Sequence, residues 1–462
     1  MTAEPVHIVI LAGGRGRRMG TDRPKVLLPM AGRPLLEWVL RTSAQLQPAS
    51  TTVVLGYSAE NVGSILSGRD IQVVTREPLL GPVHALTAVD TERGAANDGT
   101  IVVFPADVPM LRADTLRALV AHRATATSGL TVVAAVSERP YGLMRVLRSD
   151  AGEVIGLMSE KDASRQQRAI RECTSGVFAC SPSLLREALA TFAWESVGRE
   201  RSVGELAGAF RRLGHDIDAI TTTVPHEIRG INSQTELAEA SAMMRQAKCE
   251  ELMSAGVTII DPATTYVGPD VEVGHDTVLH PNVYLEGRTT VGAACEIHAG
   301  TRLVDATLED HVVILNYCVV TDSVVRSHAQ LGPFAHIRPG SDVGEDARVG
   351  NYVELKKTTL GKGSKASHLT YLGDASIGAD VNVGAGVITC NYDGVRKHQT
   401  VIGDGAFIGS DSQLVAPVSI GRGAFVAAGS SITQNVPDES LGIARSRQEN
   451  KDGWARRRRP TE

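Results

Sequence analysis

The chain contains few aromatic residues, no long apolar run and no dominant charge. Phe, Trp and Tyr make up 4% of its 462 residues, and the net charge is −5. So small a net charge creates no general attraction to nucleic acid or to an anionic membrane. The apolar segment His7–Ala12 is too short for a secretion signal, and no segment is long enough to span a bilayer. We therefore expect neither a nucleic-acid partner nor insertion into a membrane.

Cysteine is also sparse, and its spacing carries no signature of a metal site or a disulfide framework. The six cysteines are scattered along the chain and include no Cys-x-x-Cys pair. Zinc sites and disulfide frameworks both depend on cysteines at characteristic spacings. The pattern argues against either and predicts a protein of the reducing cytoplasm.

Glycine, in contrast, is abundant, and much of it belongs to a repeat. Between residues 267 and 421 an Ile, Leu or Val is often followed directly by Gly, at spacings of six or a multiple of six. This period predicts a left-handed parallel β-helix of hexapeptide repeats, whose interior the aliphatic side chains fill. The pairs begin at Val267, Val273, Val291, Leu331, Val343, Val349, Leu360, Ile377, Val383, Ile402, Ile408 and Ile420. The repeat is interrupted from Gly361 to Ser376, and we expect the chemistry of this half at the interruption.

The N-terminal half of the chain follows another pattern, in which short aliphatic runs alternate with helical segments. Residues 8–11, 52–55, 101–104 and 130–135 are predicted to be buried parallel strands, and residues 34–46 and 113–122 to be helices between them. Such alternation predicts a Rossmann-like, doubly wound α/β sheet with ligands at the carboxyl ends of its strands. Ser233–Glu236 is a capping box that opens a helix ending near Met253.

These patterns divide the chain into four predicted segments. They are an α/β domain at 1–231, a linker helix at 232–255, the β-helix at 256–445 and a basic tail at 446–462. The tail contains the run Arg456–Arg459. Such a run is either a solvated chain end or a contact for a polyanionic ligand, and the sequence leaves both interpretations open.

A glycine-rich turn with cationic residues follows the first predicted strand. Glycines at this place let backbone N–H groups approach phosphate oxygens, while Arg18 and Lys25 would neutralise triphosphate charge. The run Gly14–Met19, with Pro24-Lys25 after it, resembles the sugar-nucleotide pyrophosphorylase family, whose motif is Gly-x-Gly-x-Arg-Met followed by Pro-Lys. The resemblance implies a nucleotidyltransferase domain with nucleotide and sugar contacts at Leu11, Ala12, Gly13, Gly14, Arg18, Lys25, Gly81, Asp107, Gly142 and Asn232.

Two of these positions carry oxygen ligands suited to magnesium. Asp107 follows the strand at 101–104, and Asn232 lies just before the capping box. A lone Asp at a strand end is more often a turn former, but the resemblance implies that Asp107 and Asn232 bind Mg²⁺. One carboxylate and one amide, completed by water and phosphate oxygens, match the preference of this cation. The implied reaction is in-line attack of a sugar 1-phosphate on the α-phosphorus of a nucleotide, with release of pyrophosphate.

The repeat-containing half carries a longer resemblance. Residues 331–340, 350–357, 362–374, 382–386 and 389–394 are similar to the acetyltransferase half of the bifunctional enzymes that make UDP-N-acetylglucosamine. The resemblance implies that His368 is the general base that deprotonates glucosamine 1-phosphate as its amine attacks acetyl-CoA, a task suited to imidazole. It also implies a homotrimer, sugar-phosphate contacts at Arg338, Lys356, Tyr371 and Asn382, and acetyl-CoA contacts at Ala385, Asn391, Tyr392, Ser410, Ala428 and Arg445. Residues 391–394 equally fit a plain turn of the solenoid, and the two roles are compatible.

The α/β half departs from the family pattern where the pattern selects base and sugar. Arg76 and Leu79 replace two glutamines that would face the uracil edge, and Pro82 replaces a Thr. Two further departures, in the sugar motifs, are Ser159 and Thr174.

Three interpretations follow. The chain is a bifunctional enzyme that acetylates glucosamine 1-phosphate and then couples the product to UTP. Alternatively, it has the same acetyltransferase but a nucleotidyltransferase half of altered specificity or low activity. The third alternative is a structural or regulatory trimer, which the cluster around His368 argues against.

Overall fold

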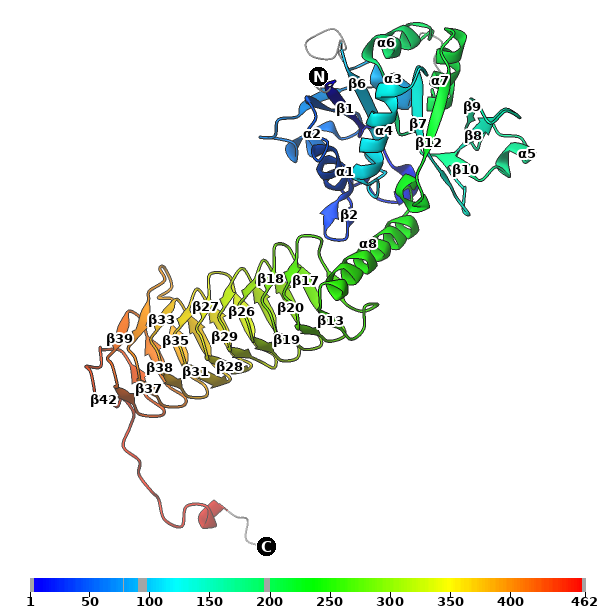
Figure 1. The fold of residues 1–462 in the computed structure, drawn as a ribbon. Coiled ribbons are helices and arrows are strands. Elements are labelled where there is room, and N and C mark those ends of the chain that lie inside the picture. Colours follow the sequence, from blue (N-terminus) through cyan, green and yellow to red (C-terminus); the bar gives the residue numbers. More distant parts are fainter. Residues whose placement is uncertain (1–3, 78, 90–97, 195–199, 459–462) are drawn as a thin grey trace. The chain divides into compact units, whose positions relative to one another are not determined.

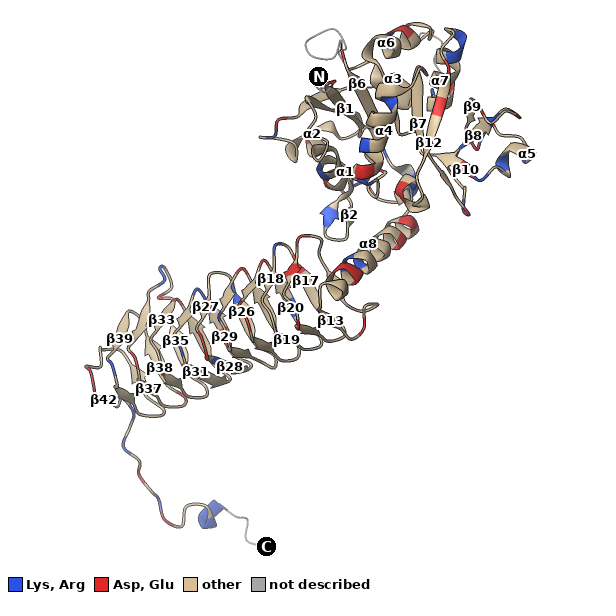
Figure 2. Cartoon of the chain, viewed as in Figure 1, with Lys and Arg blue, Asp and Glu red and all other residues tan. Residues whose placement is uncertain are grey.

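The computed structural model describes residues 4–77, 79–89, 98–194 and 200–458. It contains two compact units, residues 1–242 and residues 243–462, which Figure 1 shows as an α/β unit and a solenoid. The division falls inside helix α8 (Gln234–Ser254), along which acidic and basic residues are interspersed (Figure 2). Of the basic tail, Arg456–Arg458 form a 3-10 turn, while Arg459 to Glu462 lie outside the described residues. The segment limits proposed from the sequence stay predictions.

The α/β unit is built on a twisted sheet whose order is β5-β4-β1-β6-β11-β7-β10-β8-β9, with β12 beside β7. Strands β1, β4 and β6 are parallel, as predicted, and together with β5, a parallel strand that was not predicted, they form one half of the sheet. The strand predicted at 130–135 is β7, and its parallel partner is β12. The antiparallel strand β11, which was not predicted, lies between β6 and β7. The strands are β1 (Val6–Leu11), β4 (Ser50–Leu55), β5 (Gln72–Thr75), β6 (Thr100–Pro105), β7 (Leu130–Val136), β8 (Met144–Arg148), β9 (Val154–Met158), β10 (Glu172–Thr174), β11 (Phe178–Cys180) and β12 (Ile217–Thr221).

Two apolar cores cover the two faces of this sheet. Along β1 the side chains of Ile8 and Ile10 belong to one core, and that of Val9 to the other. All three side chains are nearly inaccessible to solvent. The strand is buried on both faces, which explains its continuous aliphatic run. Burial of each side chain contributes roughly 1.5–3 kcal/mol to the stability of the fold. The helices are α1 (Leu35–Ala44), α2 (Ala59–Ser64), α3 (Pro82–Leu86), α4 (Ala113–Thr125), α5 (Arg165–Arg168), α6 (Pro182–Ala190) and α7 (Val203–Arg212).

The solenoid consists of three parallel sheets, one on each face of a left-handed β-helix, and its coils are visible in Figure 1. The first sheet runs from β13 (Thr258–Ile259) to β42 (Leu441–Gly442), the second from β14 (Tyr266–Val267) to β41 (Ser431–Ile432) and the third from β15 (Glu272–Val273) to β39 (Val418–Ile420). Interior side chains such as Ile297, Ile314 and Leu331 are fully buried. The hexapeptide period therefore places one aliphatic side chain inside each face, as predicted. Within the described residues, no helix has the length and apolarity that a membrane crossing requires.

The expected interruption of the solenoid at 361–376 does not exist. Strands β31 (Lys365–His368) and β32 (Tyr371–Gly373) continue the ladders of the coils before them. Ala366 and Leu372 fill the interior and are fully buried. Ala366 is followed by Ser367 and not by glycine, so an interior position can be filled without the sequence signature.

The real insertion lies at the next coil. Tyr371 pairs with Ile388 of the following coil, and Ile388 pairs with Gln413 of the coil after that. More residues separate Ile388 from Gln413 than separate Tyr371 from Ile388. The extra residues form a loop at 391–399 that closes on itself through a bridge between Tyr392 and Lys397. An excursion of this kind leaves the ladder intact while placing polar side chains outside the prism.

Candidate active sites

The α/β unit contains a cavity of about 1200 Å³ at the carboxyl ends of β1 and β6. This position is where parallel α/β sheets bind ligands. Of the contacts predicted for this unit, Ala12 alone lies outside the wall, since it is buried and its N–H donates to Val54. The predicted contacts in the cavity wall are Leu11, Gly13, Gly14, Arg18, Lys25, Gly81, Asp107, Gly142 and Asn232.

The turn after β1 presents the bare backbone of Gly13, Gly14 and Gly16 to the cavity. A Cβ on Gly13 would lie 2.7 Å from the Leu79 Cδ1 atom, whereas one on Gly14 would meet open space. Gly16 adopts a left-handed conformation, with φ of 65°, at the start of the 3-10 turn Arg17–Met19. The exposed Arg18 side chain lines the cavity at this turn. The glycine backbone and a guanidinium therefore line the same space.

Lys25, Asp107 and Asn232 meet at one point of this cavity. The Lys25 ammonium pairs with the Asp107 carboxylate, and it donates to Asn232 Oδ1 over 3.2 Å. A cationic group thus bridges the two oxygen atoms that were predicted to bind magnesium. One carboxylate and one amide oxygen form a hard donor set that fits Mg²⁺. The three residues are remote in the sequence, and the sheet brings them together.

The capping box of α8 fixes the position of Asn232. Ser233 Oγ accepts from the Glu236 N–H over 3.2 Å, and the Glu236 carboxylate accepts from the Ser233 N–H over 3.0 Å. The same carboxylate also accepts from the Asn232 N–H over 2.6 Å. The capping box predicted from the sequence is confirmed, and it has the further effect of orienting the residue before it.

Leu79, Arg76 and Pro82, three departures from the family pattern, have different surroundings in the structure. Leu79 lines the cavity and packs against Gly13 and Gly56, so an apolar side chain occupies part of the expected base site. Arg76, in contrast, lies 3.4 Å from His84 Nε2, and burial together with this guanidinium lowers the pKa of His84. Pro82 is the first residue of α3, where a helix does not need its N–H.

Ser159 and Thr174, the two departures in the sugar motifs, form hydrogen bonds with other groups of the protein. Ser159 Oγ donates to Asp162 over 2.7 Å, and the buried Thr174 Oγ1 accepts from the Gly176 N–H over 3.1 Å. Ser175, which the sequence reasoning did not single out, lines the cavity, and its buried Oγ has no hydrogen-bond partner among the described residues. A buried hydroxyl with no partner is costly, so Ser175 is a candidate contact for a bound sugar.

Glu160 supplies a carboxylate beside the sugar motif. It accepts from the Gly142 N–H and lies 3.6 Å from the guanidinium of the fully buried Arg145. Glu160 directly follows Ser159 in the sequence, and its side chain contacts the Tyr141–Arg145 segment.

On the solenoid, the predicted base and several predicted acetyl-CoA contacts form one column along a corner. Asn351 and His368 are partners in successive coils. In the following coils the carbonyl of Ala385 accepts from the Asp411 N–H, and that of Ser410 accepts from the Gly429 N–H, next to Ala428. The Cδ atom of Arg445 lies near the same corner, 3.8 Å from where a Cβ on Gly429 would be. These residues therefore occupy successive coils along one corner.

His368 is oriented by a residue that the sequence reasoning missed. Its Nδ1 lies 2.8 Å from Asn351 Oδ1, and the ring is exposed. An amide oxygen can only accept, so this contact favours the tautomer with the proton on Nδ1, in which the Nε2 lone pair is free. The two residues are separated in the sequence by one coil of the solenoid, and this spacing was the available signal for the pair.

Cationic side chains gather on the adjacent face. Arg338 and Lys356 are register partners in β26 (His336–Arg338) and β29 (Glu354–Lys356). Arg338 donates to Glu354 over 2.8 Å, and Lys356 donates to Asp374 over 3.1 Å. Lys397, from the inserted loop, contacts Lys356, whose charge lowers the pKa of Lys397. Three cations on one face suit a phosphate group.

Asp374 connects this face to the inserted loop. It accepts from Lys356 and Asn391, and these bonds outweigh the opposing effect of burial, so its pKa lies below the usual value. Asp374 has a φ of 49°, a left-handed conformation that Asp tolerates at a tight corner. A Cβ on Gly373 would lie 2.4 Å from the Tyr371 hydroxyl and 2.8 Å from Asn391 Nδ2, so glycine leaves room for both side chains here.

Two further predicted contacts, Asn382 and Tyr392, have exposed side chains. Asn382 is exposed on β34 (Asn382–Val383) in the first sheet, whereas Tyr371 belongs to the second. Tyr392 is exposed on the inserted loop, and its hydroxyl donates to the Gly394 carbonyl over 2.6 Å. The predicted sugar contacts Asn382 and Tyr371 therefore lie on different faces of the solenoid.

Comparisons with known proteins agree with the two-site architecture. Family models match at residues 8–205 (MobA-like NTP transferase domain), 260–360 (GMPPB C-terminal domain) and 399–434 (six bacterial transferase hexapeptide repeats). The bifunctional protein GlmU of Shouchella clausii is 44% identical over 97% of this chain and 98% of its own length. The corresponding values for bifunctional GlmU of Koribacter versatilis are 41%, 98% and 97%, and for that of Brevibacillus brevis 42%, 97% and 97%. With such identity over almost the full length of each chain, the protein belongs to the bifunctional GlmU family.

Proposed function

We propose that the chain is a bifunctional transferase that acetylates glucosamine 1-phosphate with acetyl-CoA and then transfers UMP from UTP to the product. The observation that supports this proposal best is the presence of two separate sites in one chain. The α/β cavity holds the Lys25, Asp107 and Asn232 frame, and the solenoid corner holds the oriented His368. Each site has the polar groups that one of the two reactions needs.

In the acetyl transfer, His368 is the general base. Its free Nε2 accepts a proton from the sugar amine as the nitrogen attacks the thioester carbonyl, and the proton then passes to the departing CoA sulfur. Arg338, Lys356 and Lys397 would hold the sugar phosphate. To do so, Arg338 would give up its hydrogen bond to Glu354, and Lys356 its hydrogen bond to Asp374. The column from Ala385 to Ala428 would bind the extended acetyl-CoA chain.

In the nucleotidyl transfer, the protein positions reactants and offsets charge. A phosphate oxygen of N-acetylglucosamine 1-phosphate attacks the α-phosphorus of UTP, and the bond to pyrophosphate breaks. Asp107 and Asn232 would hold Mg²⁺, which supplies charge neutralisation when bound. Lys25 and Arg18 would bind phosphate oxygens, and the side-chain-free turn at Gly13–Gly14 gives the triphosphate room.

We further propose a homotrimer whose subunits complete the acetyltransferase site. An exposed apolar ladder runs along the corner that leads to His368, with Tyr317, Phe334, Tyr352 and Leu369 exposed by 58, 44, 57 and 62%. The rings of Tyr317, Phe334 and Tyr352 are stacked. An apolar stripe of this length favours contact with another protein surface. Asn382, which lies on another sheet from Tyr371, would then reach the sugar of a neighbouring subunit. Light scattering should give three times the chain mass, and a monomer would contradict the proposal.

The nucleotide preference is the most informative test of the α/β half. With Mg²⁺ and N-acetylglucosamine 1-phosphate, we expect pyrophosphate release with UTP that exceeds the release with ATP, GTP, CTP or dTTP. Acetyl transfer from acetyl-CoA to glucosamine 1-phosphate is measured in the same preparation as a control. Release with another nucleotide alone would show that Leu79 and Pro82 have changed the specificity. No release at all, beside normal acetyl transfer, would leave only the acetyltransferase.

A further inference from the structure

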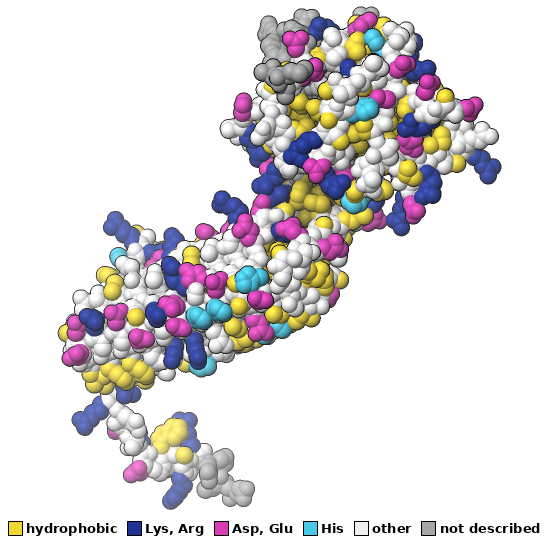
Figure 3. Space-filling view, viewed as in Figure 1, with side chains coloured by type: hydrophobic (Ala, Val, Ile, Leu, Met, Phe, Trp, Pro, Cys, Tyr) yellow, Lys and Arg dark blue, Asp and Glu magenta, His cyan; other side chains and the backbone are white. Residues whose placement is uncertain are grey.

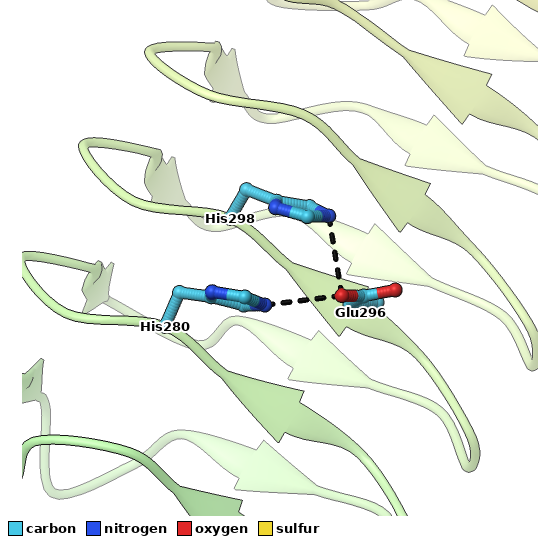
Figure 4. A group of neighbouring side chains, drawn as sticks. All are labelled: His280, Glu296 and His298. Atoms are coloured by element: carbon cyan, nitrogen blue, oxygen red, sulfur yellow. Dashed lines mark hydrogen bonds and ion pairs between the residues drawn. The ribbon is translucent and has the colours of Figure 1, made fainter.

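A cluster of two histidines and one glutamate lies on the solenoid, outside both proposed active sites. His280 and His298 follow β16 (Val278–Leu279) and β19 (Glu296–Ile297), which are register neighbours in the first sheet. Histidine side chains reach the surface of the solenoid in Figure 3. Figure 4 shows the two imidazole rings stacked and both directed at the Glu296 carboxylate, and their centroids are 4.3 Å apart. Nothing in the two transferase reactions uses these residues.

The ligand atoms have the spacing of a metal site. Glu296 Oε1 lies 3.0 Å from His280 Nε2 and 3.3 Å from His298 Nε2. All three atoms lie within 4.8 Å of one another. A tetrahedral zinc ion with bonds of about 2.0–2.1 Å holds its ligand atoms roughly 3.3–3.4 Å apart. A cation of this size can therefore bind with small adjustments of the side chains.

In the described part of the chain, no Lys or Arg is found paired with the Glu296 carboxylate. The register neighbours of Glu296 are Val278 and Val313. Among the described residues, the ion partners found for Glu296 are the two histidines, which are charged only when protonated. Two imidazoles and one carboxylate are good ligands for zinc and its neighbours in the first transition row. Magnesium and calcium prefer sets made of oxygen alone.

We propose that His280, Glu296 and His298 form a surface binding site for one divalent cation of the zinc class. The imidazoles bind through Nε2 and the glutamate through Oε1, and water completes the coordination. Since His280 lies in one coil and both other ligands in the next, the bound ion cross-links two neighbouring coils near the start of the solenoid. Cation binding to the folded state alone stabilises that state, and the stabilisation grows with the logarithm of the free ion concentration above the dissociation constant.

The test measures Zn²⁺ and Co²⁺ binding to the full chain, with excess Mg²⁺ present to fill oxygen-only sites. Equilibrium dialysis with metal analysis gives the affinity, and the visible absorption of Co²⁺ reports nitrogen ligands in a tetrahedral site. Thermal unfolding gives the stabilisation. We expect one ion for each chain, and an affinity at least tenfold weaker in both Glu296→Gln and His298→Gln. Neither variant should show the Co²⁺ absorption or the rise in Tm with Zn²⁺ that the unaltered protein shows.

His328→Gln is the matched control. His328 stacks with His311 at 4.8 Å in the same way, but among the described residues this pair belongs to no three-ligand group. The control should bind Co²⁺ and Zn²⁺ like the unaltered protein. Unchanged affinity and absorption in both Glu296→Gln and His298→Gln would overturn the proposal. Loss of the signal only in Asp107→Asn would place the ion in the α/β cavity and overturn it as well. Equal unfolding temperatures of all variants without metal show that the fold is retained.

Discussion

Replacing His368 by Ala should lower the rate of acetyl transfer by about 10²–10⁴-fold, the usual contribution of a positioned general base. The imidazole is exposed and fills no core position, so the substitution removes the proton acceptor without opening a cavity. Release of CoA thiol from acetyl-CoA and glucosamine 1-phosphate measures the effect. Pyrophosphate release in the α/β unit should stay unchanged, because its apolar cores share no residue with that of the solenoid.

His275→Ala is the control for this change. His275 is an exposed histidine on an earlier coil, and its ring pairs with Asp276. The His275→Ala variant should retain the full rate of acetyl transfer. If His368→Ala were as active as this control, His368 would not be the base. Loss of both activities in His368→Ala would instead indicate damage to the assembly.

A graded version of the same experiment uses Asn351. Asn351→Ala removes the hydrogen bond to Nδ1 and should lower kcat about tenfold, since such a bond contributes roughly 1–1.5 kcal/mol. Asn351→Asp keeps an oxygen acceptor and should recover most of the rate. KM for acetyl-CoA should change little in both variants, because the effect acts on the orientation of the base.

Replacing Asp107 by Asn should lower nucleotidyl transfer by about 10²–10³-fold, the usual effect of losing one group that stabilises developing charge. The carboxylate is the charged member of the proposed magnesium set and the ion partner of Lys25. Its loss weakens the hold on the cation and leaves the Lys25 ammonium without a counter-charge. Pyrophosphate release at increasing Mg²⁺ concentration measures the change, and the Mg²⁺ requirement should rise.

Asp114→Asn is the matched control, since Asp114 is an exposed carboxylate of the same unit that pairs with Arg117. It should leave pyrophosphate release unchanged. Acetyl transfer should be unaffected in both variants. Nucleotidyl transfer in Asp107→Asn at the rate of the control would exclude Asp107 from the metal site.

Local patterns predicted much of the fold. The aliphatic run at residues 8–11, the capping box at Ser233–Glu236 and the hexapeptide period each correspond to an element of the structure. Each rests on a periodicity or cap that adjacent residues determine among themselves. The antiparallel strand β11 escaped prediction, because a strand so short with an ordinary apolar pattern does not indicate its partners.

The arrangement of the two sites depended on the tertiary structure more than the fold did. The sequence alone identified an α/β unit, a β-helix and residues of both reactions, because glycine turns, aliphatic repeats and motif residues are local properties of the chain. It could not show that Lys25 bridges Asp107 and Asn232, that Asn351 orients His368, or that Lys397 joins Lys356. Those contacts depend on sheet order and on the register between coils, which remote parts of the chain determine together. The sequence thus determined which chemical groups are present, and the packing of distant segments decided which of them act together.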